Sequence, residues 1–315
     1  MTGRLAFLFP GQGSQRPRMG RELKAARPDL FDRYVGGAAA ASGLPLDRLC
    51  IEGSLEQLTP TDIAQPALFA LSVALHQAAR EAGLEPDFVA GHSLGEYSAA
   101  VAAGSLDFDA ALPLVCERGR LMAGAQRDRP GSMAAITGLP VERIRQICAQ
   151  ASERGLVVLA NVNSATQLVV SGETAGIERA VELAKAEGAE GATVLRVGAA
   201  FHSPLMEPTE VKMAKLIDAV RFADPKTPVV VNVWARAVSS GTELQEALKL
   251  QISRPVRWYE CVKVLLEAGC RTYLELGSGR VLAGLVRLTG EEVVAQAADS
   301  PSRIEQFKTV VLAGD

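Results

Sequence analysis

A five-residue segment, Gly-His-Ser-Leu-Gly at positions 91–95, constrains the fold of this chain more than any other feature. It matches the pattern G-x-S-x-G and stands between a short apolar run at 88–90 and a helical pattern at 96–103. A strand, a sharp turn and a helix in this order form a nucleophile elbow, in which a strained turn exposes the serine at the end of a sheet. The segment therefore predicts a sheet covered by helices and makes Ser93 a candidate nucleophile. The alternative is a chance match in an ordinary turn.

The rest of the chain alternates strands and helices. Apolar runs at 5–9, 88–90, 229–233 and 272–276 predict strands, and helical patterns separate them, which favours an α/β fold with a mostly parallel sheet. The middle of the chain differs, because its pattern over residues 125–198 is β-α-β-β-α-β, ending in a strand expected at 193–197. That order is typical of a ferredoxin-like unit. We therefore expect a small inserted domain at 125–198 and a large domain made of 1–124 and 199–315.

Composition narrows the classes of function. The chain has 315 residues, 48% of them hydrophobic, so it can build a substantial core. A net charge of −3 does not favour a nucleic-acid or anionic-membrane binder, and no apolar stretch is long enough to span a bilayer. The five cysteines include no C-x-x-C pair, so we expect neither a zinc site nor a disulfide framework, and a reducing cytoplasm fits them better.

A serine nucleophile needs a base, and the chain has only three histidines. His76 lies within a predicted helix, where a structural role is the simpler interpretation. His92 adjoins Ser93, so its side chain should point elsewhere and orient the turn. His202 remains as the base, in a loop between the inserted domain and a helix that begins with proline, although a surface histidine is the alternative. No aspartate obviously completes a triad, so a backbone carbonyl could orient the base instead.

Arg118 lies within an apolar stripe of the helix expected at 107–124. It stands at i+4 from Leu114 and i+3 from Val115, whereas Glu117 and Arg120 fall outside the stripe. A cation on a buried face is costly unless an anion meets it. Arg118 is therefore expected to pair with a protein carboxylate or with a substrate carboxylate. A third possibility is that its stem packs while its head reaches water.

The glycine-rich turn at 11–15 follows the first strand and invites a nucleotide-binding interpretation. Position 16 is Arg16 instead of the third glycine of G-x-G-x-x-G, and the chain has no G-x-x-x-x-G-K-[ST] segment. We therefore reject nucleotide-phosphate binding as the main role. A turn at the carboxyl end of a strand can instead offer a backbone N–H to an oxyanion.

Several segments together resemble the malonyl-CoA:acyl carrier protein transacylases and the acyltransferase domains of polyketide synthases. They lie at 9–15, 91–96, 117–120, 161–164, 255–258 and 275–279, together with His202, and the resemblance covers nearly the whole chain. It implies a large hydrolase-like α/β domain with a ferredoxin-like insert. It also implies Ser93 as nucleophile and His202 as base.

The same resemblance implies roles for five further residues. The backbone N–H groups of Gln12 and Leu94 would form the oxyanion hole, and Arg118 would hold the malonyl carboxylate. The backbone carbonyl of Gln251 would orient His202, and Asn161 would contact the substrate. Phe201 is similar to the residue found in malonyl-selective polyketide members, where fatty-acid members often carry a smaller side chain.

The activity implied is transfer of malonyl from malonyl-CoA to an acyl carrier protein, in fatty-acid or polyketide synthesis, by a monomer that needs no cofactor. A hydrolase of the same fold is the first rival, and Arg118 argues against a general esterase. A non-catalytic scaffold that binds the carrier is the second rival.

Overall fold

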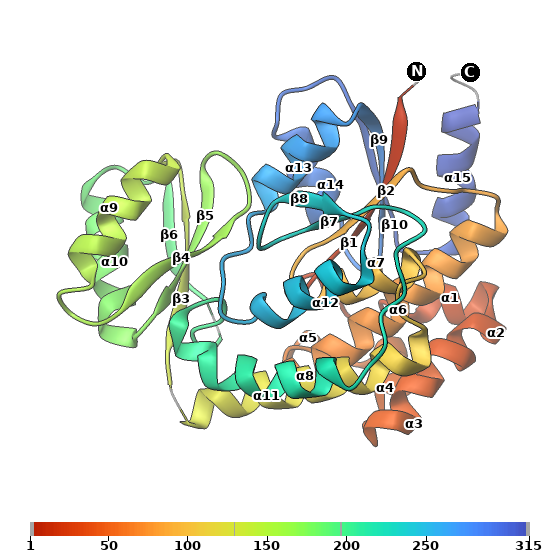
Figure 1. Cartoon of the computed structure of the whole chain (residues 1–315), viewed down its shortest axis with the longest axis horizontal. Helices are drawn as coiled ribbons and strands as arrows, with labels where there is room; N and C mark the ends of the chain where they lie inside the picture. The colour runs from red at the N-terminus through yellow and green to blue at the C-terminus, as the bar shows by residue number, and fades with distance from the viewer. Residues whose placement is uncertain (1–2, 129, 196, 313–315) are drawn as a thin grey trace.

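The computed structural model describes residues 3–128, 130–195 and 197–312, which form two sheets and their covering helices (Figure 1). The larger sheet has the strand order β10-β9-β1-β2-β7-β8. All its neighbouring strands pair in parallel except β8, which runs antiparallel to β7. Its strands are β1 (Arg4–Phe9), β2 (Phe88–Gly91), β7 (Val229–Val231), β8 (Arg236–Val238), β9 (Cys270–Leu276) and β10 (Val294–Ala298). The α/β class and the mostly parallel sheet expected from the alternating pattern are confirmed.

Helices bury both faces of this sheet, as a parallel sheet requires. Phe7 and Phe9 of β1 face the cluster that contains α6, whereas Ala6 and Leu8 face the cluster that contains α13 and α14. The helices of this domain are α1 (Arg21–Ala26), α2 (Pro28–Leu30), the π-helix Phe31–Gly36, α3 (Gly37–Ser42), α4 (Leu46–Glu52), α5 (Leu55–Leu58), α6 (Thr61–Glu81), α7 (Gly95–Ala102), α8 (Phe108–Asp128), the 3₁₀-helix Pro204–Met206, α11 (Glu207–Asp218), α12 (Gly241–Leu250), α13 (Trp258–Glu267), α14 (Val281–Arg287) and α15 (Pro301–Leu312).

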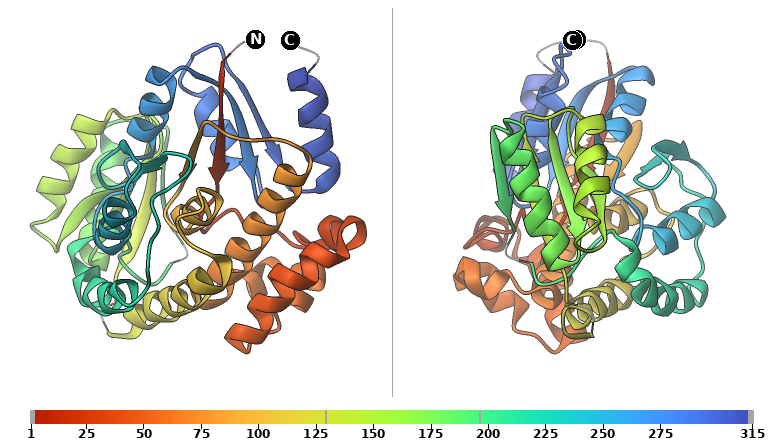
Figure 2. Two further views of the ribbon diagram at one scale, coloured as in Figure 1. Left: turned by 45° about the vertical axis from the view of Figure 1, so that its right-hand side comes forward. Right: turned by 90° about the vertical axis from the view of Figure 1, so that its left-hand side faces the viewer.

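The smaller sheet is antiparallel and has the order β4-β5-β3-β6. It is built from β3 (Ser132–Thr137), α9 (Val141–Ala151), β4 (Val157–Val162), β5 (Gln167–Gly172), α10 (Thr174–Ala186) and β6 (Gly191–Val194). Figures 1 and 2 show α9 and α10 together on its outer face. Ile136 packs with these helices, whereas Met133 and Val169 join the core of the larger domain. The open face of the small sheet therefore borders the large domain.

Several predicted elements differ in extent from the structure; the strand expected at 229–233, for example, ends at Val231. The last strand of the small sheet occupies 191–194 and not 193–197, because its pairing with β3 begins at Gly191 opposite Thr137 and stops at Val194 opposite Ala134. The helix that carries Arg118 continues past 124 to Asp128.

The structure also bears on metals, cysteines and membranes. Within the described ranges, no group of three His, Cys, Asp or Glu side chains could hold a metal ion. The five cysteine thiols are free. No helix in the part of the chain that the structure describes is both long and apolar enough to cross a bilayer.

Candidate active site

The Gly-His-Ser-Leu-Gly segment forms a tight turn between β2, which ends at Gly91, and α7, which begins at Gly95. Ser93 has a φ of 50°, a left-handed conformation that is costly for a residue with a side chain. A Cβ on Gly95 would lie 2.0 Å from the carbonyl oxygen of Phe9. Glycine is therefore required there, since the start of α7 rests directly on the end of β1.

The glycine-rich turn at 11–15 packs against this elbow. A Cβ on Gly11 would lie 2.4 Å from the carbonyl oxygen of His92, so the two turns touch through their backbones. The backbone N–H groups of Gln12 and Leu94 donate to no partner among the described residues. Two unpaired N–H groups, one from each turn, thus stand at the site where the sequence predicts an oxyanion hole.

His202 is the histidine that meets the serine. Its Nε2 lies 2.9 Å from Ser93 Oγ, and its Nδ1 lies 2.8 Å from the backbone oxygen of Gln251. A carbonyl oxygen can only accept, so Nδ1 carries the proton and Nε2 is free to accept one from the serine. Burial, and then the charge of Arg118, lower the pKa of His202 to about 3, which keeps the imidazole neutral at physiological pH.

The other two histidines lie elsewhere. His92 is half-buried, and its Nε2 lies 2.9 Å from Asn163 Oδ1, so it joins the elbow to the loop that follows β4. His76 packs its ring edge-on against Phe7 and Phe9 in the core, and burial lowers its pKa to about 4. His76 therefore has the structural place expected from the sequence.

Arg118 is buried at 1% exposure and points into the site. Its Nη1 donates to Gln65 Oε1 at 2.7 Å, and its Nη2 donates to Gln251 Oε1 at 2.8 Å and to Ser93 Oγ at 3.1 Å. These partners are neutral, and no carboxylate of a described residue lies within ion-pair distance of the guanidinium. The sequence left three possibilities open for Arg118. Within the described residues, the direct ion pair with a protein carboxylate is wrong, and the interpretation in which the guanidinium reaches water is wrong as well. A buried cation without an anion remains beside the nucleophile.

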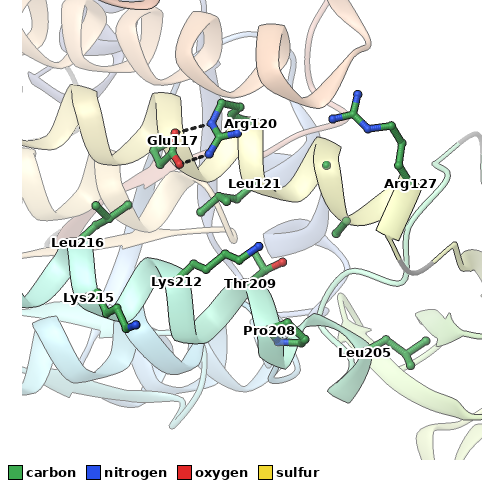
Figure 3. A pocket seen from close by; sticks show the side chains of 12 residues that line it. Glu117, Arg120, Leu121, Arg127, Leu205, Pro208, Thr209, Lys212, Lys215 and Leu216 are labelled. Carbon is green, nitrogen blue, oxygen red and sulfur yellow. Dashed lines mark hydrogen bonds and ion pairs between the residues drawn. The ribbon is translucent and has the colours of Figure 1, made fainter.

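The prediction that Glu117 and Arg120 lie outside the apolar stripe of this helix is confirmed. Glu117 and Arg120 form an ion pair on the outer side of α8. They line a second hollow of about 550 Å³ between α8 and α11, in which Leu121 and Lys212 also lie (Figure 3). The serine does not line this hollow, and α8 contributes different residues to the two cavities, Arg118 and Met122 to the site and Glu117, Arg120 and Leu121 to the hollow.

The site opens into a cavity of about 390 Å³ between the large domain and the small sheet. Gln12, Ser93, Arg118 and His202 line it, together with Asn161 and Phe201, which face it from β4 and from the loop before His202. Asn161 Oδ1 has no hydrogen-bond partner among the described residues. The structure therefore gathers the predicted site residues around one cavity, with Leu94 and Gln251 directly behind it.

Sequence reasoning missed two buried polar residues that hold the elbow. Asn232 Oδ1 accepts from the backbone N–H of Ser93 at 2.8 Å, and its Nδ2 donates to the carbonyl of Gly91 at 2.8 Å. Glu96, at 0% exposure, accepts from the backbone N–H of Asn232 at 2.7 Å and from Gln251 Nε2. The available signal for Asn232 was a polar residue inside the strand predicted at 229–233.

A nucleophile elbow at the carboxyl edge of a parallel sheet, a serine bonded to a histidine, and a buried arginine beside them define a class of α/β acyl-transferring proteins. Residues 6–314 match the family described as acyl transferase domain. The malonyl CoA-acyl carrier protein transacylase of Bacillus subtilis strain 168 is 42% identical over 303 residues, which cover 96% of this chain and 95% of that protein. The chain therefore belongs to the malonyl CoA-acyl carrier protein transacylase family of acyl transferases.

Solved structures agree with this assignment. The acyl-carrier-protein S-malonyltransferase of Burkholderia pseudomallei 1710b is 38% identical, superposes with a TM-score of 0.91, and the match covers 97% of this chain and 99% of that one. The malonyl-transacylase PlMCAT, solved in complex with the type II polyketide synthase acyl-carrier protein AntF, is also 38% identical, with a TM-score of 0.92 and coverage of 96% and 98%.

Proposed function

We propose that this chain transfers a malonyl group from malonyl-CoA to the phosphopantetheine thiol of an acyl carrier protein, through a malonyl ester on Ser93, in fatty-acid or polyketide synthesis. The names of its relatives support the reaction, and the complex of PlMCAT with AntF supports the carrier as partner. The observation that carries the proposal is the guanidinium of Arg118. It is buried, its hydrogen-bond partners are all neutral, and its Nη2 lies 3.1 Å from Ser93 Oγ. A site of this kind favours an acyl group that brings its own carboxylate.

In the first half-reaction, His202 Nε2 takes the proton from Ser93 Oγ, which attacks the thioester carbon of malonyl-CoA. The backbone N–H groups of Gln12 and Leu94 stabilise the tetrahedral oxyanion. The intermediate collapses when the C–S bond breaks, and coenzyme A leaves as a thiol with the proton from His202. The Gln251 carbonyl accepts from Nδ1–H throughout, so the imidazolium that forms is oriented and stabilised.

In the second half-reaction, the carrier's phosphopantetheine thiol gives its proton to His202 and attacks the malonyl-serine carbonyl. The C–O bond to Ser93 breaks, the serine recovers the proton, and malonyl leaves on the carrier. This chemistry calls for no cofactor, because the side chains and backbone groups supply the base, the oxyanion donors and the carboxylate clamp. All of them come from one chain, which fits a monomer.

We further propose that Asn161 and Phe201 shape the acyl pocket. Asn161 lines the cavity, and its side-chain oxygen has no partner among the described residues, so this side chain can bind a polar group of the substrate. Phe201 occupies space directly before His202 and limits what the α-carbon of the acyl group can carry. A malonyl group fits this restriction better than a branched one.

The domain boundaries belong to the same proposal. We take residues 125–198 as a ferredoxin-like domain inserted between the two parts of the catalytic domain, 1–124 and 199–315. The β4-β5-β3-β6 order and the position of α9 and α10 on one face support it.

A cytoplasmic location of the protein remains a prediction.

The test is to incubate the protein with malonyl-CoA and measure its intact mass, with peptide mapping of the modified residue. We expect one malonyl adduct, located on Ser93, which a holo acyl carrier protein then removes. Ser93→Ala is the matched control and should acquire none. Wild-type protein without an adduct, or with an adduct on another residue, contradicts the proposal. Release of free malonate at an equal rate with and without carrier would instead favour the hydrolase.

A further inference from the structure

The side chain of Gln251 lies between the two buried charges of the site. Its Oε1 accepts from Arg118 Nη2 at 2.8 Å, and its Nε2 donates to Glu96 Oε2 and, at 2.8 Å, to the backbone oxygen of Ser93. One primary amide therefore separates a guanidinium from a carboxylate. This is a different part of Gln251 from the backbone carbonyl that orients His202.

Glu96 has the hydrogen bonds of an ionised carboxylate. Its Oε1 accepts from the backbone N–H of Asn232 and its Oε2 accepts from Gln251, so both oxygens act as acceptors. Burial raises the pKa of Glu96 to about 7, and the hydrogen bonds and the charge of Arg118 oppose that rise. A buried carboxylate and a buried guanidinium ordinarily pair directly, since each offsets the other's desolvation cost. Here they do not, because the amide occupies the space between them.

We propose that the Gln251 side chain determines substrate selectivity as a neutral spacer. Held by Glu96, it keeps the guanidinium of Arg118 off the protein's own carboxylate and leaves that charge for the carboxylate of the incoming acyl group. This inference rests on the proposed function, because it assumes that Arg118 receives the acyl carboxylate. A carboxylate at position 251 would occupy the guanidinium permanently and remove the advantage of malonyl over a neutral acyl group.

A structural role for the same side chain would have different consequences. Gln251 also supports the backbone of Ser93 and, through its own carbonyl, His202. A change that merely loosened these contacts would slow the loading of every acyl group alike. The ratio of malonyl to acetyl loading therefore separates the two explanations, whereas the rate with malonyl alone does not.

The experiment compares Gln251→Glu with the double variant Glu96→Gln/Gln251→Glu. The double variant exchanges the carboxylate and the amide, so it retains the net charge and places the carboxylate directly beside Arg118. Gln150→Glu, at an exposed position of α9, is the control for an added negative charge. Thermal unfolding of each protein checks the fold, and intact mass after rapid quenching gives the rate constant of Ser93 loading from malonyl-CoA and from acetyl-CoA.

We expect the malonyl-to-acetyl ratio to fall at least about tenfold in both Gln251→Glu proteins, which corresponds to the loss of one charge-assisted hydrogen bond to substrate. Gln150→Glu should keep the wild-type ratio. If the double variant folds and its ratio stays within about twofold of wild type, the spacer role is wrong. Should neither Gln251→Glu protein fold, Gln251→Ala, which empties the space between Arg118 and Glu96 and lets the two charges pair, is measured in the same way; the same fall is expected, and an unchanged ratio overturns the idea. Failure of wild-type protein to accept malonyl would instead refute the proposed function itself.

Discussion

Arg118→Met removes the guanidinium from the cavity while it keeps an unbranched apolar side chain in the middle of α8. The change tests the assignment of the malonyl carboxylate to Arg118. In the structure the guanidinium is almost inaccessible to water and donates hydrogen bonds only to neutral oxygens, those of Gln65, Gln251 and Ser93. Salt therefore screens this charge little. Because no described residue provides a directly bonded carboxylate, the substrate carboxylate would be the anionic partner of Arg118.

The magnitude follows from the number of bonds that the carboxylate can make. A guanidinium can donate two parallel hydrogen bonds to a carboxylate, and each charge-assisted bond contributes about 1.5–3 kcal/mol. Two such bonds correspond to roughly 10²- to 10⁴-fold in kcat/KM, at about 1.4 kcal/mol for each factor of ten. Nη2 already bonds to Gln251 and Ser93, so malonyl replaces existing partners. We therefore expect the low end, a loss of about 100-fold with malonyl-CoA.

Acetyl-CoA provides the comparison, because it lacks the free carboxylate of malonyl-CoA and its rate should change by less than about tenfold. The assay is the rate of adduct formation on Ser93 by quenched intact-mass measurement, over a range of each CoA ester. Arg120→Met is the matched control, since Arg120 lies two residues away on the same helix and pairs with Glu117 at the surface. Equal losses with both esters, or an unchanged rate with malonyl-CoA, would refute the carboxylate clamp.

Three further predictions concern the elbow, the base and the pocket. Asn232→Ala removes the side chain that binds the Ser93 N–H and the Gly91 carbonyl. We expect the free energy of unfolding to fall by about 2–5 kcal/mol, measured by denaturant titration, and Ser93 loading to slow in the mass assay. Asn232→Asp should give intermediate values in both measurements. The neutral form of His202 is the base and its pKa is lowered to about 3, so loading is lost only as pH falls toward that value. Its pH profile should lack a half-point near 6.5 that belongs to His202, so a half-point that persists in Glu96→Gln, where the other group with a pKa near 7 is absent, would contradict this assignment. Phe201→Ser should raise loading from methylmalonyl-CoA relative to malonyl-CoA, and an unchanged ratio in a competition assay would show that Phe201 does not limit the pocket.

Local patterns predicted the parts of this protein that depend on neighbouring residues in the chain. The elbow, the apolar stripe around Arg118 and the alternation of strands and helices are all short-range features, and the structure contains each of them. The six short helices between residues 21 and 58, the π-helix included, are different, because glycine, proline and charged residues interrupt any helical period there. The edge strands β8 and β10 have three and five residues, which is too short for a period of two to stand out.

The supports of the site could not be predicted because they depend on strand order. Asn232 reaches the elbow because β7 lies beside β2, and the carboxyl ends of adjacent parallel strands meet at one edge of the sheet. The sequence predicts both strands but not that they are neighbours. A polar residue inside the strand predicted at 229–233 could therefore equally have faced solvent.

The same reasoning explains why the sequence left the partner of Arg118 open. Helical phase shows that the arginine is buried, and burial of a charge implies an anion, but phase cannot say whether the protein or the substrate provides it. The protein does hold a buried carboxylate nearby, Glu96, yet its partner Gln251 comes from a segment 155 residues away and separates the two charges. An arginine paired with Glu96 would have been a structural ion pair with no preference among acyl groups. Whether Arg118 serves the fold or the substrate thus depends on one distant amide.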